Sequence, residues 1–412
     1  MSAAVTSERL YYDDSYTVRF PARVAAVGEH RGRPAVELAS TYFYPESGGQ
    51  EADRGILGES KIVDVQADET DRVWHVLAAG DPVLGAGAEV EGSVDWARRF
   101  DHMQQHTGQH ILSAALERVL SAATLSSHLG EERSSIEVAL ADADWKTIAR
   151  VEEAANRVVW EDRIVERHWV NDEEVKRFAL RKPPQVTGRI RIVEIPDWDV
   201  SACGGTHTRR TGEVGTIKIV RWEKVRGNVR FEFLCGARAL SDHAWRTEAL
   251  LEGARRRTLK DRELIPQLER AAAERDELRK RLDEATERLL AAEARDRVGN
   301  PPRGVSDFAP SRPREEVRRL VLKCLEAGAP WAVAGSGSPD PVVVAGRAKA
   351  LAIDLKAMVP SLLERSGGKG GGSPDLVQTS AADASAAEAA WRWMADEVSR
   401  RANEIYASGR TP

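Results

Sequence analysis

His106-Thr107-Gly108-Gln109-His110 leads directly into the apolar run Ile111-Leu112-Ser113-Ala114-Ala115-Leu116. The two histidines stand at i and i+4, which places both imidazoles on one face of a helix, one turn apart. The apolar positions that follow repeat at helical spacing, so the stretch is predicted to be a helix. Such a helix offers two nitrogen ligands to a metal ion, and other segments must supply the remaining ligands.

A second pair with the same spacing, Cys203 and His207, encloses Gly204-Gly205-Thr206. Glycines in this position allow a tight turn around an ion. The two pairs together predict one Zn²⁺ per chain, held by nitrogen and sulfur donors. Four protein ligands are typical of a closed structural zinc site, whereas a catalytic zinc keeps a position for water or substrate, so both roles stay open. Thr107 takes the place of the glutamate found in zinc proteases, which disfavours peptidase chemistry.

Composition narrows the class of protein. The 412-residue chain has a net charge of −5, so any nucleic-acid binding must come from local patches. No apolar run reaches the roughly 18 residues of a membrane span, and the N-terminus lacks the apolar core of a signal peptide. Three cysteines are too few for a disulfide framework. These features predict a cytoplasmic protein of two or three domains.

Cations gather on both sides of the second pair. Arg177, Arg181, Lys182 and Arg189 lie between Lys176 and Arg191 with no acidic residue among them. A second basic run follows His207 and begins with Arg209 and Arg210. Cations beside a metal site suggest a polyanionic substrate. Solvation of exposed strand surfaces is the alternative.

The chain is predicted to be an α+β protein of several domains. Turn-punctuated β-rich segments in residues 1–95 predict a small β-barrel. Residues 96–240 combine strands with the His106–His110 helix and a helix from Asp142 to Trp160, and they predict an α+β domain. Within the barrel segment, Gly48-Gly49 would let the loop Tyr44–Gln50 approach another surface closely, and a plain hairpin loop is the alternative.

Residues 241–299 predict a long helix or helical hairpin. Leucine and alanine follow heptad steps from Leu264 to Ala292, interrupted once by Arg275. Pro266 is expected to mark the start of this helix. Dimerisation through the seam and packing on the same chain are equally open.

Residues 300–412 predict a C-terminal α/β domain after the linker Asn300–Gly304. Helices are expected at residues 314–327, around 348–363 and from about 382 to 407. The run Gly367–Gly372 around Lys369 looks like a backbone cradle for phosphate, although it lacks the spacing of a Walker loop. A flexible linker is the alternative.

Three of these motifs together resemble a known family. Tyr44-Pro45-Glu46-Ser47-Gly48-Gly49-Gln50, His106-Thr107-Gly108-Gln109-His110 and Cys203-Gly204-Gly205-Thr206-His207 look like the editing domain of alanyl-tRNA synthetase and its free-standing relatives, the AlaX proteins. Gly367-Gly368-Lys369-Gly370-Gly371-Gly372-Ser373-Pro374-Asp375 resembles the synthetase's C-terminal domain, which is shared with the DHH phosphoesterases. Few residues precede the barrel, so we expect no aminoacylation domain and a resemblance to the long form of AlaX.

The resemblance implies an ATP-independent hydrolase that maintains translation fidelity by deacylating tRNA-Ala mischarged with serine, with glycine as an additional target left open. It implies that His106, His110, Cys203 and His207 bind the zinc. It also implies a hydroxyl-bearing residue that discriminates serine from alanine, for which the candidates are Ser127, Thr124 and Ser126, with Ser127 favoured. Contacts to substrate or tRNA are expected from Gln109, Thr206, Arg209, Arg210, Gly368, Lys369 and Gly370.

Two other interpretations fit the same residues. A non-catalytic tRNA-binding or RNA-binding protein with a structural zinc is the main alternative, and a zinc hydrolase of peptides or small esters is a weaker one. The synthetase's C-terminal domain binds the outer corner of tRNA and can dimerise. A homodimer is therefore expected through residues 241–299 or through the C-terminal domain. Neither serine nor glycine is preferred by the sequence.

Overall fold

The computed structural model describes residues 7–82 and 84–408. The chain divides into two compact units, Met1–Arg257 and Thr258–Pro412. Each unit has its own hydrophobic cores, so each is described by itself. Among the described residues, no helix combines the length and apolarity needed to cross a membrane.

A closed barrel forms the first part of unit 1, in the order β2-β3-β7-β6-β5-β8. Alternating apolar residues point into it, and Phe20, Val24, Leu57 and Val65 are among its buried core. The barrel prediction is confirmed. The strands are β2 (Arg19–His30), β3 (Arg33–Leu38), β5 (Gly55–Leu57), β6 (Ser60–Ala67), β7 (Val73–Leu77) and β8 (Glu89–Val94). A short parallel pair, β1 (Glu8–Arg9) and β4 (Ser40–Thr41), lies outside it.

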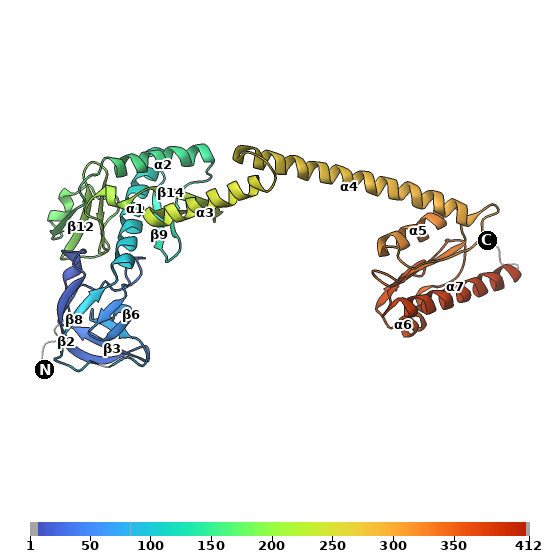
Figure 1. Cartoon of the computed structure of the whole chain (residues 1–412), viewed down its shortest axis with the longest axis horizontal. Helices are drawn as coiled ribbons and strands as arrows, with labels where there is room; N and C mark the ends of the chain where they lie inside the picture. Colours follow the sequence, from blue (N-terminus) through green and yellow to red (C-terminus); the bar gives the residue numbers. More distant parts are fainter. Residues whose placement is uncertain (1–6, 83, 409–412) are drawn as a thin grey trace. The chain divides into compact units, whose positions relative to one another are not determined.

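Helix α1 (Trp96–Leu120) leaves the barrel and runs through the remainder of unit 1 (Figure 1). Asp95 caps its start by accepting a hydrogen bond from the Arg98 amide at 3.2 Å. Every residue from His102 to Leu116 is buried, including the polar ones. A helix buried on all sides cannot satisfy its polar side chains with water, so each needs a partner within the fold.

Two sheets surround α1. The four-stranded antiparallel sheet has the order β14-β15-β10-β9, and the three-stranded sheet has the order β11-β12-β13. The apolar half of α1 shares one core with these sheets and with α2 (Trp145–Trp160), the helix predicted there. The strands are β9 (Thr124–Leu129), β10 (Ser134–Val138), β11 (Glu166–Val170), β12 (Ile190–Ile195), β13 (Asp199–Ala202), β14 (Ile217–Val225) and β15 (Asn228–Cys235).

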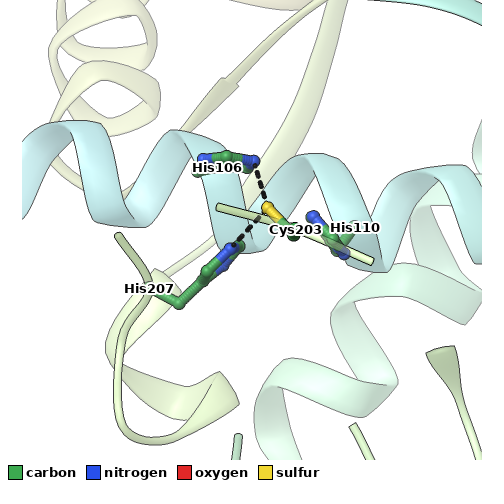
Figure 2. A group of neighbouring side chains, drawn as sticks. All are labelled: His106, His110, Cys203 and His207. Carbon is green, nitrogen blue, oxygen red and sulfur yellow. Dashed lines mark hydrogen bonds between the residues drawn. The ribbon is translucent and has the colours of Figure 1, made fainter. Parts of the chain in front are cut away.

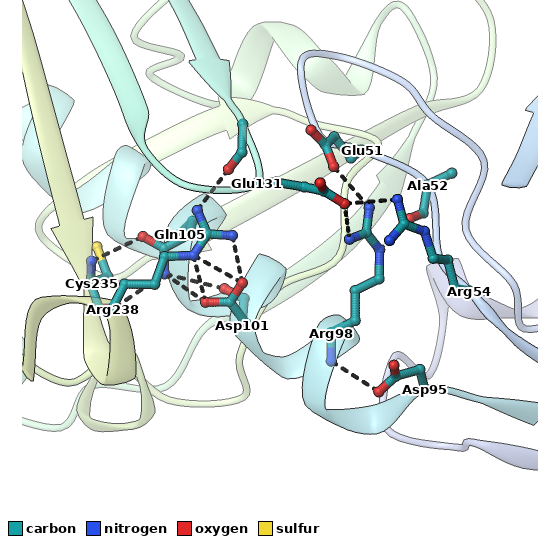
Figure 3. A network of polar contacts seen from close by, with 11 residues as sticks. Glu51, Ala52, Arg54, Asp95, Arg98, Asp101, Gln105, Glu131, Cys235 and Arg238 are labelled. Carbon is teal, nitrogen blue, oxygen red and sulfur yellow. Dashed lines mark hydrogen bonds and ion pairs between the residues drawn. The ribbon is translucent and has the colours of Figure 1, made fainter. Parts of the chain in front are cut away.

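Charged side chains on the first turns of α1 attach it to its neighbours (Figure 3). Arg98 donates to Glu51 at 2.8 Å and to Glu131 at 2.7 Å, which joins the barrel loop to the β9–β10 turn. One turn later, Asp101 accepts a hydrogen bond from Arg238 at 2.8 Å. Arg238 belongs to α3 (Gly236–Arg255), so both ends of the network converge on α1.

Unit 2 contains a five-stranded sheet in the order β16-β17-β18-β20-β19. One face is covered by α5 and the end of α4, and the other by α6 and α7. The strands are β16 (Val305–Ala309), β17 (Trp331–Ser336), β18 (Val342–Arg347), β19 (Gly370–Gly372) and β20 (Leu376–Ser380). The helices are α4 (Asp261–Val298), α5 (Arg314–Glu326), α6 (Val359–Ser366) and α7 (Ala384–Ala407).

Two expectations for unit 2 are wrong in detail. Helix α4 begins at Asp261, before Pro266, whose ring is accommodated inside the helix. No helix covers residues 348–355 of the described chain, because Leu351, Ile353 and Leu355 are buried in alternation with exposed neighbours. That burial has the period of an extended chain. The helix in this region, α6, begins only at Val359, with Pro360 in its first turn.

Candidate metal centre and cavity

The four predicted metal donors meet in the interior of unit 1. Helix α1 supplies His106 and His110, and the loop that follows β13 supplies Cys203 and His207 (Figure 2). The Cys203 sulfur lies 3.3 Å from His106 Nε2 and 3.2 Å from His207 Nε2. Their ligand atoms all lie within 4.8 Å of one another. The cluster could therefore hold one metal ion.

Each imidazole is oriented through its other ring nitrogen. Gln50 Oε1 lies 2.8 Å from His106 Nδ1, and Asp199 Oδ2 lies 2.8 Å from His110 Nδ1. Thr107 Oγ1 lies 3.2 Å from His207 Nδ1. Outer partners of this kind fix the orientation of a metal-binding histidine and leave its Nε2 for the ion.

The loop between β13 and His207 approaches α1 too closely for a side chain. A Cβ atom on Gly205 would stand 2.1 Å from Cε1 of His106, whereas one on Gly204 would stand 3.7 Å from Tyr12. Gly205 is thus required for the two halves of the cluster to meet. Arg191 holds the same loop by donating to the carbonyls of Cys203 at 2.8 Å and Gly205 at 2.9 Å.

The charges in the cluster favour a thiolate. Burial raises the pKa of the Cys203 thiol, but the nearby imidazoles of His106 and His207 lower this pKa well below its ordinary value. Burial likewise opposes the charged form of His110, yet its hydrogen bond to Asp199 raises the pKa of His110 to about 9. The thiolate is the form of cysteine that binds metals.

A cavity of about 730 Å³ opens onto three of the four donors, His106, His110 and Cys203. Of the predicted substrate residues, Gln109, Thr124 and Ser127 line this cavity beside His106, His110 and Cys203. In the described part of the chain its lining excludes Ser126, Thr206, Arg209 and Arg210. Thr206 is fully buried and accepts a hydrogen bond from Gln50 at 2.8 Å. Arg209 and Arg210 pair with the carboxylates of Asp14 and Asp162.

Gly368, Lys369 and Gly370 lie in unit 2. Gly370 begins the edge strand β19, which pairs with β20. A Cβ on Gly368 would stand 2.1 Å from the Ser380 carbonyl oxygen, and one on Gly370 would stand 2.2 Å from that of Gln378. These glycines therefore serve the close approach of two strands, which is a different structure from a phosphate-binding loop at the start of a helix.

Three residues that contribute to the site lie outside the two metal motifs, and the sequence did not predict their roles. Gln50 and Asp199 orient the histidines, and Ser113 receives hydrogen bonds from Gln109 at 2.8 Å and Thr124 at 3.0 Å. Gln50 ends the loop Tyr44–Gln50, where Gly49 lies against β9 and its carbonyl accepts from the Leu129 amide at 2.9 Å. That contact agrees with the prediction that the glycines allow a close approach.

Comparison with known proteins agrees with this geometry. Residues 190–231 match the family described as the threonyl and alanyl tRNA synthetase second additional domain, and they include Cys203 and His207. The chain is 35% identical over 240 residues to the alanyl-tRNA editing protein AlaX-L of Pyrococcus horikoshii, a match covering 57% of this chain and 59% of that protein. The predicted resemblance to AlaX-type editing proteins is confirmed.

Relatives of a second kind extend the similarity. The alanine–tRNA ligase of Methanopyrus kandleri is 34% identical over 398 residues, which covers 90% of this chain and 42% of the ligase. The ligase of Ignicoccus hospitalis is 31% identical over 388 residues, covering 89% of this chain and 40% of the ligase. The matched region is thus less than two thirds of each relative's length, and the similarity to these ligases reaches through both units.

Proposed function

We propose that this protein is a trans-editing deacylase that hydrolyses the ester between serine and the terminal adenosine of tRNA-Ala, with glycine as a second substrate. The observation that carries the proposal is the cavity on which His106, His110 and Cys203 open, in a chain similar to an alanyl-tRNA editing protein. An aminoacyl ester is already activated, so hydrolysis needs a positioned water and a polarised carbonyl more than a strong nucleophile.

The donor set fits Zn²⁺, which prefers nitrogen and sulfur ligands in tetrahedral sites. His106, His110, Cys203 and His207 would hold one zinc ion, which supplies a Lewis acid for the ester carbonyl when bound. Gln50, Thr107 and Asp199 would keep the imidazoles in position. Cys203 serves as a ligand in this proposal and forms no covalent intermediate.

Discrimination against alanine is assigned to the polar wall of the cavity. Gln109 and Thr124 line it and both donate to the buried Ser113, while Ser127 lines it without such a bond among the described contacts. A wall built to hydrogen-bond a hydroxyl group disfavours alanine, because its methyl group would fill that position and leave the buried polar groups unpaired. The sequence favoured Ser127, but Thr124 is buried and Ser127 is exposed, so we propose Thr124 as the first candidate for contact with the serine hydroxyl and Ser127 as the second.

The test is hydrolysis of charged tRNA in the absence of ATP. Zinc-loaded protein should release serine from Ser-tRNA-Ala and leave Ala-tRNA-Ala intact, and a chelator should abolish the release. Thr124→Val, which keeps the shape and removes the hydroxyl, should lower kcat/KM for the seryl substrate by about tenfold and affect the glycyl substrate less. Equal inertness of the zinc-loaded protein toward all three substrates would refute the proposal.

A non-catalytic tRNA-binding protein with a structural zinc is the second candidate. The presence of four protein donors favours it, because structural zinc sites are closed by four ligands. This candidate predicts tRNA binding without deacylation. Turnover by the native protein that is lost in a His110→Ala variant, while that variant folds and binds tRNA, would exclude it.

The wider assignments belong to the same proposal. The partner is tRNA-Ala, with its acceptor end at unit 1 and contacts to Arg209 and Arg210 there. Gly368, Lys369 and Gly370 of unit 2 would contact another part of the tRNA. We further propose a cytoplasmic location, a functional division into residues 1–95, 96–240, 241–299 and 300–412, and a homodimer formed through the third or fourth of these parts.

A further inference from the structure

The wall of the metal-centre cavity is strongly cationic. It includes Arg9, Arg181, Lys182, Arg189 and Arg191, against a single acidic side chain in the lining of the described chain, Asp71. The whole protein has a net charge of −5. The positive charge is therefore local to the cavity and opposite in sign to the net charge of the protein. Such a cavity attracts anions toward the metal donors.

Three of these cations are already engaged by the protein. Arg9 pairs with Asp71, and Arg181 pairs with Asp199 at 2.7 Å. Arg191 is buried, and its guanidinium donates to the backbone carbonyls of the cluster loop. These three side chains hold the site together, so their charges are partly neutralised or committed to the fold.

Lys182 and Arg189 differ from the other three. Within the described chain, no carboxylate lies at ion-pair distance from either of them, although both line the cavity. Burial and the neighbouring charge of Arg181 lower the pKa of Lys182. Both side chains are exposed to solvent, so their charges are not neutralised by the protein and are available to form charge-assisted hydrogen bonds with a bound anion.

Aromatic packing holds Arg189 in place. Its guanidinium carbon lies 4.1 Å from the centre of the Trp169 ring, and that ring meets Tyr12 edge-on with centroids 5.5 Å apart. The indole Nε1 donates to Asp13 at 3.0 Å, which fixes the plane of the ring. Lys182 is followed by Pro183 and Pro184, whose rings restrict the backbone of this part of the wall.

We propose that Lys182 and Arg189 bind the last phosphodiester groups of an RNA 3′ end and guide it toward the metal donors. This inference rests on the proposed function and extends it to residues outside the metal motifs. A cavity of about 730 Å³ has the size of a small-ligand site, so it admits a terminal nucleotide and not a duplex. Trp169 is a positioning residue, because its ring holds the Arg189 guanidinium where it would meet the RNA backbone.

The test measures binding of uncharged RNA, and hence does not depend on hydrolysis. The probes are a fluorescent acceptor-stem hairpin ending in CCA and the same hairpin without its last three nucleotides. Native protein should bind the intact hairpin about tenfold more tightly than the truncated one. Lys182→Ala and Arg189→Ala should each weaken binding of the intact hairpin by about five- to tenfold and bind the truncated hairpin as the native protein does.

Two matched controls are available on α2. Lys146 and Arg150 are exposed residues of the same types in the same unit, so Lys146→Ala and Arg150→Ala should bind both hairpins as the native protein does. The slope of log K against log salt for the intact hairpin should fall by about 0.7 for each cavity cation removed. Trp169→Phe should retain most of the affinity that Trp169→Ala loses.

The inference is overturned if the native protein binds both hairpins equally, or if the cavity variants match the α2 controls. These outcomes are distinct from failure of the proposed function. A protein that deacylates no aminoacyl-tRNA, yet loses CCA-dependent binding in Lys182→Ala and Arg189→Ala, would contradict the editing proposal and uphold this one. Serine release that persists without CCA-dependent binding would do the reverse.

Discussion

Gly204 and Gly205 are neighbours of the same type with different surroundings. Gly205 is buried against the His106 ring, and Gly204 is exposed. The difference arises because the loop turns once between Cys203 and His207, so that only one of the two backbone positions faces α1. The meeting of the four donor side chains consequently depends on the absence of a single methyl group.

Gly205→Ala should displace the His106 ring, since the new Cβ would stand 2.1 Å from its Cε1. We expect zinc affinity to fall by about ten- to a hundredfold, as for other changes to the partners of a metal ligand. The measurement is competition with a chromophoric chelator. Gly204→Ala is the control and should bind zinc as the native protein does. Equal affinities in the two variants would contradict the role assigned to Gly205.

For individual residues, the sequence motifs identified the four metal donors but not the side chains that hold the histidines in orientation. The i, i+4 spacings of His106–His110 and Cys203–His207 predicted the four side chains that the structure brings together. Gln50 and Asp199 were not predicted as partners, because each contact joins segments far apart in the chain and a sequence records no such distance. Asp199 carries one weak signal, a carboxylate placed just before the second pair.

At the scale of elements, one buried ion pair joins α1 to the barrel. Arg99 is fully buried and donates through Nε to Asp53 at 3.0 Å and through Nη1 to the Ser15 carbonyl at 2.8 Å. Asp53 also accepts from the Tyr44 amide at 2.6 Å. The pair thus fixes the start of α1, the helix that carries His106 and His110, against the loop that carries Gln50.

Arg99→Met should destabilise unit 1 by about 3–5 kcal/mol, because it leaves the Asp53 carboxylate buried without its partner. Denaturant unfolding followed by tryptophan fluorescence measures the change. Arg157→Ala is the control, since Arg157 pairs with Glu153 on the surface and each side chain is 66% exposed. Its effect should stay within about 0.5 kcal/mol. Similar losses in both variants would contradict the assignment.

Helix α4 shows why a periodic pattern can predict an element without predicting its neighbour. Leu290, Ala294 and Val298 share a hydrophobic core with α5. They form a different stripe of the helix from the predicted seam, which includes Leu289 and Ala292. The seam residues Leu278, Leu282 and Leu289 are 55%, 67% and 71% exposed. Local spacing predicted the helix, but which stripe is buried depends on the position of α5. Residues 348–355 illustrate the opposite case, where tertiary burial overrides helical spacing.

The exposed seam gives a prediction about assembly. If it pairs with a second copy, light scattering of the native protein should give twice the mass of 45.3 kDa. Leu278→Glu with Leu282→Glu should then return the mass to that of one chain, because buried charges oppose a coiled coil. Arg279→Glu, a charge change on the same helix, is the control. A native mass of one chain would refute the dimer.

At the scale of the whole molecule, the metal donors all belong to unit 1 and none belongs to unit 2. Calorimetry of the zinc-loaded protein should show two unfolding transitions. A chelator should lower the melting temperature of one of them and leave the other unchanged, because a ligand stabilises only the unit that binds it. Lowering of both transitions by the same amount would contradict independent units.

The wide separation of the two donor pairs in the sequence also has a consequence for biosynthesis. The segment with His106 and His110 leaves the ribosome before Cys203 and His207 are made, since roughly a hundred residues separate the pairs. At synthesis rates of about 5–20 residues per second, the first pair waits on the order of 5–20 s for the second. The nascent chain can thus bring the four donors together only after most of unit 1 has been translated, so under the zinc proposal metal uptake would be a late marker of correct folding.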